Sequence, residues 1–479
     1  MHLSSALAVF AFMPVSSALA LTNLTSADCG TVLSSANETY VLIANMDCSA
    51  AQHGLIIGAA GITIDGAGHI LDGGGADART CSVLMDEGEP AGQPCRVDSN
   101  GDGLSSGIFN AVATAGGAIP VGQGGFDNLT VKNLEITGWC DGIFASGTIG
   151  ADPDDPATHD LVEGLKIDHN VIHHNGTDCD TCFNDAVFTA LLGVADSSYP
   201  NLTPINNPGT YSCTEENTSV ISNNNIWSQK GMGIEGGPGG NGINLQGGVE
   251  YDIETTNPIR YSSCVEVHNN AIMKTRLSGI MLTHALEGVN MYKNDIEYAE
   301  YGGITIPCDF VKFNTIEHNV ISKCAGVGIG VFDGTHITGN VVKDTVKGMD
   351  RFTAMGFPNA GDGILINSGD AGKIGNTSDL QDNISCFSFD KDIKVVGGSV
   401  IGCGDNQCCK TNAAADSCHR WNCACFGPDA DCNDPGTGAA GWSDWKQSIA
   451  ADINNDGVVG YPDYGVMTLN KDNKYTELW

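Results

Sequence analysis

The chain has 479 residues, of which 57 are acidic and 22 are basic, and its formal net charge is −35. Such an acidic chain lacks the basic face that phosphate backbones require, which argues against nucleic acid as a partner. Nineteen cysteines are more than a reducing compartment normally tolerates. We therefore expect most of them to be paired in disulfides, with at least one left over because the count is odd.

Residues 1–20 have the pattern of a secretory signal peptide. An apolar run over residues 5–15 is too short to span a bilayer, and the small-residue triplet Ala18-Leu19-Ala20 follows it. No later stretch has the length and apolarity of a membrane span. We therefore expect a secreted protein, extracellular or at the cell surface, with a glycoprotein surface if its host glycosylates the N-x-Ser/Thr sequons.

The segment after the signal peptide contains four recognisable pieces. They are Cys29-Gly30, the strand-like Tyr40-Val41-Leu42, Cys48, and the run Ile62-Thr63-Ile64-Asp65-Gly66. Their order resembles the capping start of secreted right-handed parallel β-helix proteins of the carbohydrate-binding and sugar-hydrolase type. With the repeats below, the resemblance covers about residues 25–402 and implies that fold, with Cys29 and Cys48 closing the cap. It implies less about chemistry, because that superfamily includes lyases, hydrolases, epimerases and non-catalytic surface proteins.

An Asn-x-aliphatic triplet recurs along the middle of the chain, beginning at Asn170, Asn224, Asn270, Asn294, Asn319 and Asn340. Gly-Ile follows nine residues after four of these asparagines, at Gly233, Gly279, Gly303 and Gly328, and Asn133 keeps the same gap to Gly142. The last three intervals, of 24, 25 and 21 residues, suit three short strands joined by turns, which is one coil of a parallel β-helix.

This register makes two structural predictions. Each asparagine should adopt the left-handed conformation at a tight turn and hydrogen-bond the asparagine of the next coil. The aliphatic residue two positions later should point inward, so that one buried column forms from Ile172, Ile226, Ile272, Ile296 and Ile321.

Equal offsets on successive coils form outside columns. The column four residues after each asparagine, or five after Asn224, is read as His174, Gln229, Lys274, Tyr298, Lys323 and Asp344. Lys274, Tyr298 and Lys323 are candidate catalytic residues, because a uronate lyase or epimerase needs a cation for the carboxylate and an acid or base for the C5 proton. Polar columns are equally expected on any β-helix exterior, so a purely structural role is the alternative.

A second candidate column follows the Gly-Ile strand and contains His284, Asp309 and Asp333. Acidic pairs at this position would suit hydrolysis of a glycosidic bond. Loop insertions are expected at residues 195–215, 235–260 and 349–360, and the last two flank this strand. Because loops that leave one face of a solenoid usually build its binding face, we expect the second column to be the better placed one.

The composition changes at Cys403, after which seven cysteines occur up to Cys432. Their irregular spacing favours a disulfide knot over a zinc site, although His419 lies among them.

Residues 452–463 have the spacing of an EF-hand calcium loop. Gly457 makes the sharp turn, and the predicted calcium ligands are Asp452, Asn454, Asp456, the carbonyl of Val458, and Asp463. The terminal Asp resembles the calcium segment of type I dockerins, which have two such segments where this chain has one. The sequence therefore predicts calcium binding and a cell-surface or matrix protein partner for this segment; the alternative is a solvated acidic turn.

The predicted organisation is a signal peptide over 1–20, a β-helix with its cap over 21–402, a Cys-rich knot over 403–440 and a calcium segment over 441–479. The Gly-His-Gly, Arg-Ile-Lys and Asp-Pro-His motifs of related enzymes are absent from the sequence. Three classes stay open: a polysaccharide lyase, C5-epimerase or glycoside hydrolase; a module that only binds polysaccharide; and a structural or adhesive cell-surface or extracellular-matrix protein. We favour a protein that acts on or binds extracellular polysaccharide, and the negative charge disfavours polyuronates.

Overall fold

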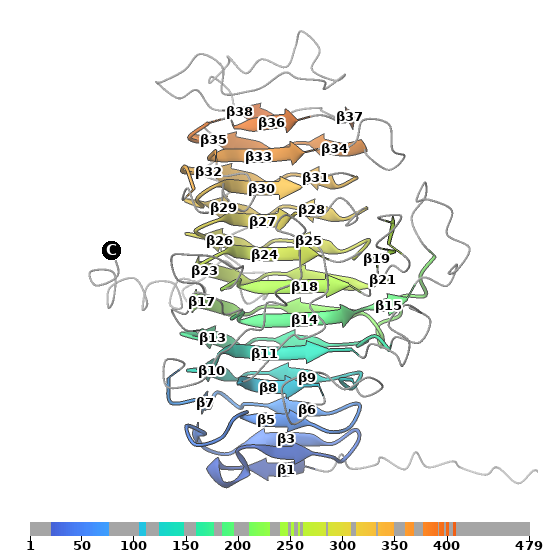
Figure 1. The fold of residues 1–479 in the computed structure, drawn as a ribbon, viewed down its shortest axis with the longest axis vertical. Coiled ribbons are helices and arrows are strands. Elements are labelled where there is room, and N and C mark those ends of the chain that lie inside the picture. The colour runs from blue at the N-terminus through green and yellow to red at the C-terminus, as the bar shows by residue number, and fades with distance from the viewer. Residues whose placement is uncertain are drawn as a thin grey trace, which may run out of the picture.

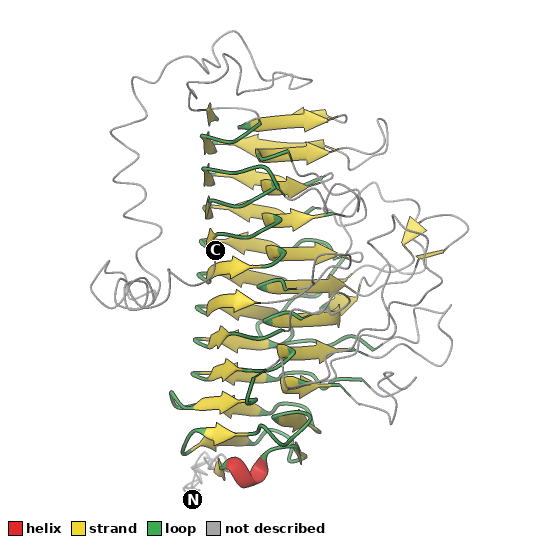
Figure 2. Cartoon of the chain, turned by 60° about the vertical axis from the view of Figure 1, so that its left-hand side comes forward, coloured by secondary structure: helices red, strands yellow, loops and turns green. Residues whose placement is uncertain are grey.

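The computed structural model describes residues 21–75, 105–111, 124–147, 160–176, 184–195, 210–229, 240–247, 251–252, 257–258, 262–283, 286–307, 313–331, 334–348, 360–367, 377–390, 392–396, 399–401 and 406–408. Within these ranges the only helix is a single 3-10 turn, η1 (Ser26–Asp28), at the N-terminal end (Figure 2). No helix in the described part is long and apolar enough to cross a membrane.

Three parallel sheets run along the molecule, and from β3 onward the chain visits sheets 1, 2 and 3 in turn (Figure 1). Sheet 1 contains β1 (Leu21–Leu24), β3 (Thr39–Leu42), β6 (Thr63–Asp65), β9 (Thr130–Lys132), β12 (Lys166–Asp168), β16 (Ser219–Ser222), β22 (Val265–His268), β25 (Asn290–Tyr292), β28 (Thr315–Glu317), β31 (His336–Thr338), β34 (Thr377–Gln381) and β37 (Ser399–Ile401). Sheet 2 contains β4 (Met46–Asp47), β7 (Ile70–Asp72), β10 (Glu135–Thr137), β13 (Val171–His173), β17 (Asn225–Gln229), β23 (Ala271–Thr275), β26 (Asp295–Glu297), β29 (Val320–Ser322), β32 (Val341–Lys343), β35 (Ile384–Cys386) and β38 (Gln407–Cys408). Sheet 3 contains β2 (Thr31–Leu33), β5 (Leu55–Ile57), β8 (Ser106–Asn110), β11 (Asp141–Ser146), β14 (Val187–Leu192), β18 (Ile243–Gly247), β24 (Ser278–Thr283), β27 (Gly302–Ile306), β30 (Val327–Val331), β33 (Asp362–Asn367) and β36 (Ile393–Val396).

Two short antiparallel pairs lie outside these sheets. They are β15 (Val194–Ala195) with β21 (Ser262–Ser263), and β19 (Tyr251–Asp252) with β20 (Asn257–Pro258). The right-handed parallel β-helix predicted from the repeats is therefore confirmed for the described coils.

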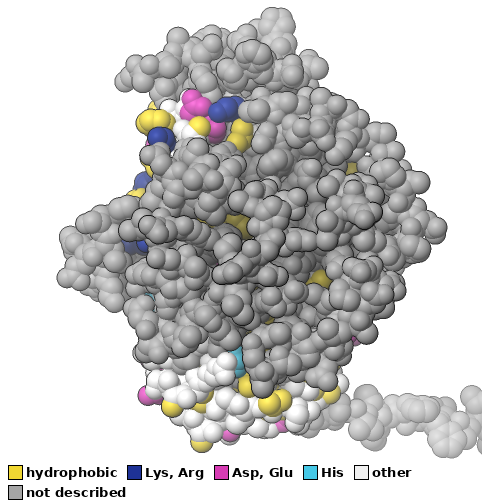
Figure 3. Space-filling view, viewed as in Figure 1, with side chains coloured by type: hydrophobic (Ala, Val, Ile, Leu, Met, Phe, Trp, Pro, Cys, Tyr) yellow, Lys and Arg dark blue, Asp and Glu magenta, His cyan; other side chains and the backbone are white. Residues whose placement is uncertain are grey.

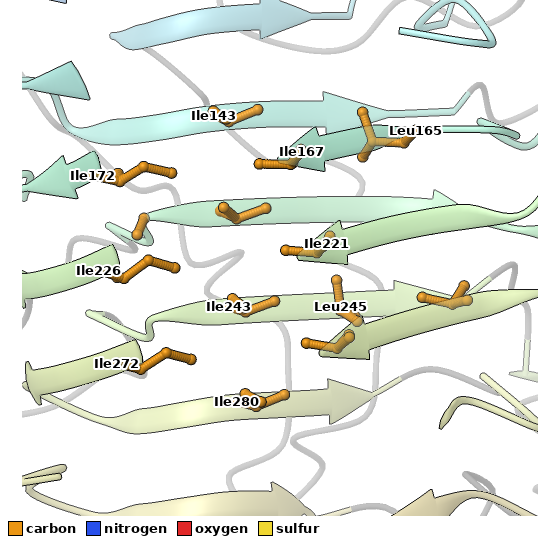
Figure 4. Packing of buried hydrophobic residues seen from close by; sticks show 14 of the residues in the cluster. Ile143, Leu165, Ile167, Ile172, Ile221, Ile226, Ile243, Leu245, Ile272 and Ile280 are labelled. Carbon is orange, nitrogen blue, oxygen red and sulfur yellow. The ribbon is translucent and has the colours of Figure 1, made fainter. Parts of the chain in front are cut away.

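The interior is a stack of aliphatic side chains. The predicted isoleucine column is confirmed: strand pairing joins Ile172, Ile226, Ile272, Ile296 and Ile321 in succession, and each is at most 1% exposed. Figure 4 shows three of them turned toward isoleucines from the other two sheets. Each coil thus buries apolar area from all three walls, which is the main stabilising contribution to the fold.

The predicted asparagine ladder is also confirmed. Each ladder side chain donates from Nδ2 to Oδ1 of the next, at 2.9–3.1 Å, through Asn170, Asn224, Asn270, Asn294, Asn319, Asn340, Asn383 and Asn406. The prediction that these asparagines are themselves left-handed is wrong. The left-handed residue is the one before, such as His169 (φ 55°) and Lys293 (φ 55°), which leaves the ladder side chain free to point inward.

Three details of the predicted register are corrected. Leu134, not Asn133, occupies the ladder position of its coil, because its N–H donates to Oδ1 of Asn170. Ile243 pairs with Ile280, so Gly242-Ile243 takes the place expected for Gly233-Ile234. The corner residue of that coil is Ser228 (φ 53°) rather than Gln229, whose side chain is buried.

Two disulfides lie wholly within the described residues. Cys29–Cys48 closes the N-terminal cap as predicted, and Cys213 is bonded to Cys264. The buried Cys324 is a free thiol. The predicted knot over 403–440 falls almost wholly outside the described part of the chain.

Candidate functional site

The first candidate column lies at the corner between sheets 2 and 3. Ala271, Asp295 and Val320 are paired in register, so the corner residues three positions later also stack coil on coil. Those residues are Lys274, Tyr298 and Lys323, all left-handed with φ of 55°, 59° and 55°. The structure therefore brings the three predicted residues into one column. Figure 3 shows Lys and Arg side chains along the left edge of the molecule.

Two members of this column are in direct contact. Nζ of Lys323 donates to Oη of Tyr298 at 2.9 Å and to Oε1 of Glu297 at 2.6 Å. Burial lowers the pKa of Lys323, but the hydrogen bonds to Glu297 and Tyr298 outweigh it, so this pKa lies above its usual range. Lys323 is therefore a fixed cation beside a phenol, with a carboxylate that already balances its charge.

The second candidate column cannot be placed, since His284, Asp309 and Asp333 lie outside the described residues. The same holds for the calcium-loop residues Asp452, Asn454, Asp456, Val458 and Asp463. Among the residues that are described, no group of three or more His, Cys, Asp or Glu side chains could hold a metal ion.

A carboxylate pair that the sequence analysis missed lies where the strands of sheet 3 begin. Ile143 pairs with Val187, and two residues before each of them stand Asp141 and Asp185. The N–H of Asp185 donates to Oδ1 of Asp141 at 2.8 Å. Neighbouring parallel strands are about 4.8 Å apart, so the two aspartates lie next to each other on adjacent coils.

The pair belongs to the outer side of sheet 3. Oδ2 of Asp185 accepts from Nδ2 of Asn244 at 2.9 Å, and Asn244 pairs with Phe188. Phe188 stacks with Phe144 at 5.2 Å between ring centroids, in a cluster separate from the aliphatic interior. Asp141 is 4% exposed and Asp185 is fully buried.

Burial changes the protonation of both carboxyls. It raises the pKa of Asp185 to about 6, although hydrogen bonds from Asn244 and Asn241 work in the opposite direction. Burial, together with the neighbouring Asp185, raises the pKa of Asp141 well above its usual range. A carboxyl group whose pKa is raised can hold and donate a proton near neutral pH, which general acid–base chemistry uses.

Several polar atoms next to this pair have no hydrogen-bond partner within the described part of the chain. They are Oδ1 of Asn244, both side-chain polar atoms of Asn184, and Oγ of Ser106, which pairs with Asp141. All three side chains are at most 3% exposed. Leaving a buried polar atom unpaired costs about 1–3 kcal/mol, so such a group requires an explanation, and a ligand that hydrogen-bonds here is one.

The sequence held one signal for this pair. Asp141 and Asp362 both precede Gly-Ile, and the structure puts Asp362 at the equivalent position, since Ile329 pairs with Ile364. Asp362 contacts Lys394 at 3.2 Å, and burial raises the pKa of Asp362 to about 6 although Lys394 works in the opposite direction. Asp185 precedes Ala-Val instead, which hid it from a search for Gly-Ile.

Comparison with known proteins supports the fold only. A family model described as "Right handed beta helix region" matches residues 213–379. No curated protein matches the chain.

Similar solved structures are distant. One is the A-module of the mannuronan C-5 epimerase AlgE4 of Azotobacter vinelandii, at 12% identity, TM-score 0.36, and coverage of 81% of this chain and 80% of that one. The Dettilon tailspike protein is 12% identical with a TM-score of 0.34, and 81% of this chain matches 59% of it. The catalytic unit of an alpha-1,3-glucanase from Streptomyces thermodiastaticus is 11% identical with a TM-score of 0.29, and 80% of this chain matches 60% of it. These likenesses assign no activity to this chain.

Proposed function

We propose that the protein is secreted and hydrolyses an extracellular polysaccharide at the outer side of sheet 3, with Asp141 and Asp185 as its acid and base. The observation that carries this proposal is the buried carboxylate pair, whose pKa values are both raised and whose neighbours Ser106, Asn184 and Asn244 hold unpaired polar atoms.

The proposed chemistry gives each carboxyl one role. Burial and the neighbouring Asp185 raise the pKa of Asp141, so Asp141 can hold a proton and donate it to the glycosidic oxygen as the bond breaks. Asp185 is ionised above about pH 6 and serves as the nucleophile on the sugar carbon, or as the base that takes a proton from the attacking water. Both carboxyls are out of contact with solvent, so a sugar chain reaches them only if this face opens.

The corner column supports a second candidate function. The contact between Lys323 and Tyr298 joins a fixed cation to a hydroxyl that can exchange a proton, which suits a lyase or C5-epimerase acting on uronates. Glu297 already neutralises Lys323, and the net charge of −35 repels polyanions, so we rank this candidate below hydrolysis. A binding module or an adhesive matrix protein would leave both sites without turnover.

The test is a panel of neutral and acidic polysaccharides assayed for reducing ends and for unsaturated products. Asp141→Asn should lower hydrolysis by about 10²–10⁴-fold, because the asparagine still accepts the N–H of Asp185 but has no proton to donate. Asp362→Asn is the matched control, since it has the same place on a distant coil and should leave activity unchanged. Full activity in Asp141→Asn refutes the assignment, and product formation that requires Tyr298 instead would move it to the corner column.

We also propose that the predicted calcium loop, Asp452 to Asp463, binds one calcium ion and stabilises the C-terminal segment, where it can serve a matrix or cell-surface partner. Its support is the ligand spacing in the sequence. Secretion is proposed on the signal-peptide pattern and agrees with the disulfide bonds at Cys29–Cys48 and Cys213–Cys264.

A further inference from the structure

Two adjacent histidines converge on the outer side of sheet 2. His173 ends strand β13, and His174 follows it at the corner with a left-handed φ of 50°. Successive side chains of a strand normally point to opposite faces. The left-handed residue breaks this alternation, and the rings meet at a centroid distance of 4.8 Å with Nδ1 of His173 2.6 Å from Nδ1 of His174.

Neighbouring coils hold His173 from two sides. On the coil before, Oε1 of Glu135 lies 3.0 Å from Nε2 of His173. On the coil after, the Trp227 ring stacks on the His173 ring at 4.4 Å with an interplanar angle of 6°. Strands β10, β13 and β17, which carry these residues, are consecutive in sheet 2 (Figure 1). The side chain of His173 is only 13% exposed, so its ring is fixed in place.

The contact with Glu135 decides where one hydrogen lies. A carboxylate only accepts, so Nε2 of His173 carries a hydrogen. In the neutral form of His173 the lone pair on Nδ1 then faces His174, and neutral imidazole is the form that binds metals.

We propose that His173 and His174 form a chelating site for a divalent transition-metal ion, with both Nδ1 atoms as ligands and Glu135 as the carboxylate that orients His173. A carboxylate on the second nitrogen is the usual companion of a metal-binding histidine. The net charge of −35 also raises the local concentration of cations.

The separation of the nitrogens selects the metal. With bonds of about 2.0 Å, cis ligands at 90° lie about 2.8 Å apart, and tetrahedral ligands lie about 3.3 Å apart. The observed separation of 2.6 Å is nearer the first value, so the two Nδ1 atoms must move apart less for a tetragonal ion than for a tetrahedral one. Copper(II) should therefore bind more tightly than zinc, an order that imidazole ligands also favour.

The experiment titrates the full, disulfide-intact chain, stripped of metals, with copper sulfate and separately with zinc sulfate, by calorimetry. Paramagnetic resonance of the first copper equivalent should show two imidazole nitrogens. His174→Asn, which tolerates the left-handed conformation, should remove one copper site. Glu135→Gln should weaken that site about 10–100-fold.

His169→Asn is the matched control, because His169 is also left-handed and half-exposed but contacts Asp168 rather than a second histidine. It should leave the copper stoichiometry and affinity unchanged. The proposal fails if His174→Asn binds copper as the parent does, if His169→Asn loses as much, or if the resonance spectrum lacks two nitrogens. The spectrum of the parent decides the matter even if a variant does not fold.

Discussion

The asparagine ladder allows a stability prediction to be worked out bond by bond. The side chain of Asn294 makes four hydrogen bonds: Oδ1 accepts from the N–H and Nδ2 of Asn270, and Nδ2 donates to Val267 O and to Oδ1 of Asn319. Asn294→Ala removes all four and leaves the buried N–H of Asn270 unpaired. At about 1 kcal/mol for each bond, the free energy of unfolding should fall by about 4 kcal/mol.

Asn290 is the matched control, four residues earlier in the same coil. Its side-chain oxygen has no hydrogen-bond partner in the described part of the chain, so Asn290→Ala breaks no bond through that oxygen and should not lower the free energy of unfolding. Equilibrium unfolding in urea, followed by circular dichroism, gives both values from the midpoint at a fixed m-value. If Asn294→Ala costs no more than Asn290→Ala, the ladder does not stabilise the stack and the reasoning is refuted.

Three further predictions concern protons, disulfides and calcium. Because burial raises the pKa of Asp185 to about 6, the folded state holds its proton more tightly than the unfolded chain, whose value is about 3.9. Stability should therefore fall by up to about 3 kcal/mol as pH rises from about 4 to about 6, and a pH series of Asp185→Asn should lack this slope if the cause is correct. Replacing both Cys29 and Cys48 by Ser opens a 19-residue loop and should lower the free energy of unfolding by about 3 kcal/mol. An unchanged urea midpoint would show that this disulfide does not stabilise the cap. Asp456→Ala should abolish the thermal shift on calcium addition, and calorimetric calcium binding equal to that of the parent would contradict the loop.

The fold could be predicted because its repeats constrain the sequence. Every ladder position needs a side chain that both donates and accepts, and every inward position needs an aliphatic one, so Asn294 and Ile296 repeat coil after coil. The corner column could be predicted by the same counting, and the contact between Tyr298 and Lys323 follows from it.

What escaped prediction depends on insertions and on backbone conformation. The connection between β17 and β18 is longer than the equivalent connection between β23 and β24 in the next coil. Counting nine residues from Asn224 therefore reaches Gly233, whereas Gly242 is the residue that precedes the inward isoleucine of β18. The left-handed residue was assigned to the asparagine itself, since asparagine favours that conformation, whereas the position before it tolerates lysine and histidine. The aspartate pair was missed because its two members belong to coils separated by long insertions.

The asparagine ladder, the corner column and the aspartate pair differ in what a substitution would disturb. This difference helps to tell residues that stabilise the fold from residues that could take part in catalysis. A ladder asparagine shares its hydrogen bonds with both neighbouring coils, so a change there propagates along the stack. Corner residues such as Lys274 and His174 need only the left-handed backbone, and Lys, Tyr, His, Asp and Ser all occupy this position in different coils. Because the corner position constrains the backbone and not the side chain, chemistry can vary there from coil to coil at little structural cost. Asp141 and Asp185 each accept a backbone N–H of the next coil, as a ladder residue does. At Asp141 an asparagine would also accept that N–H, and it would do so without a raised pKa. A carboxylate in a place where an amide suffices for structure is the strongest reason to look for catalysis there.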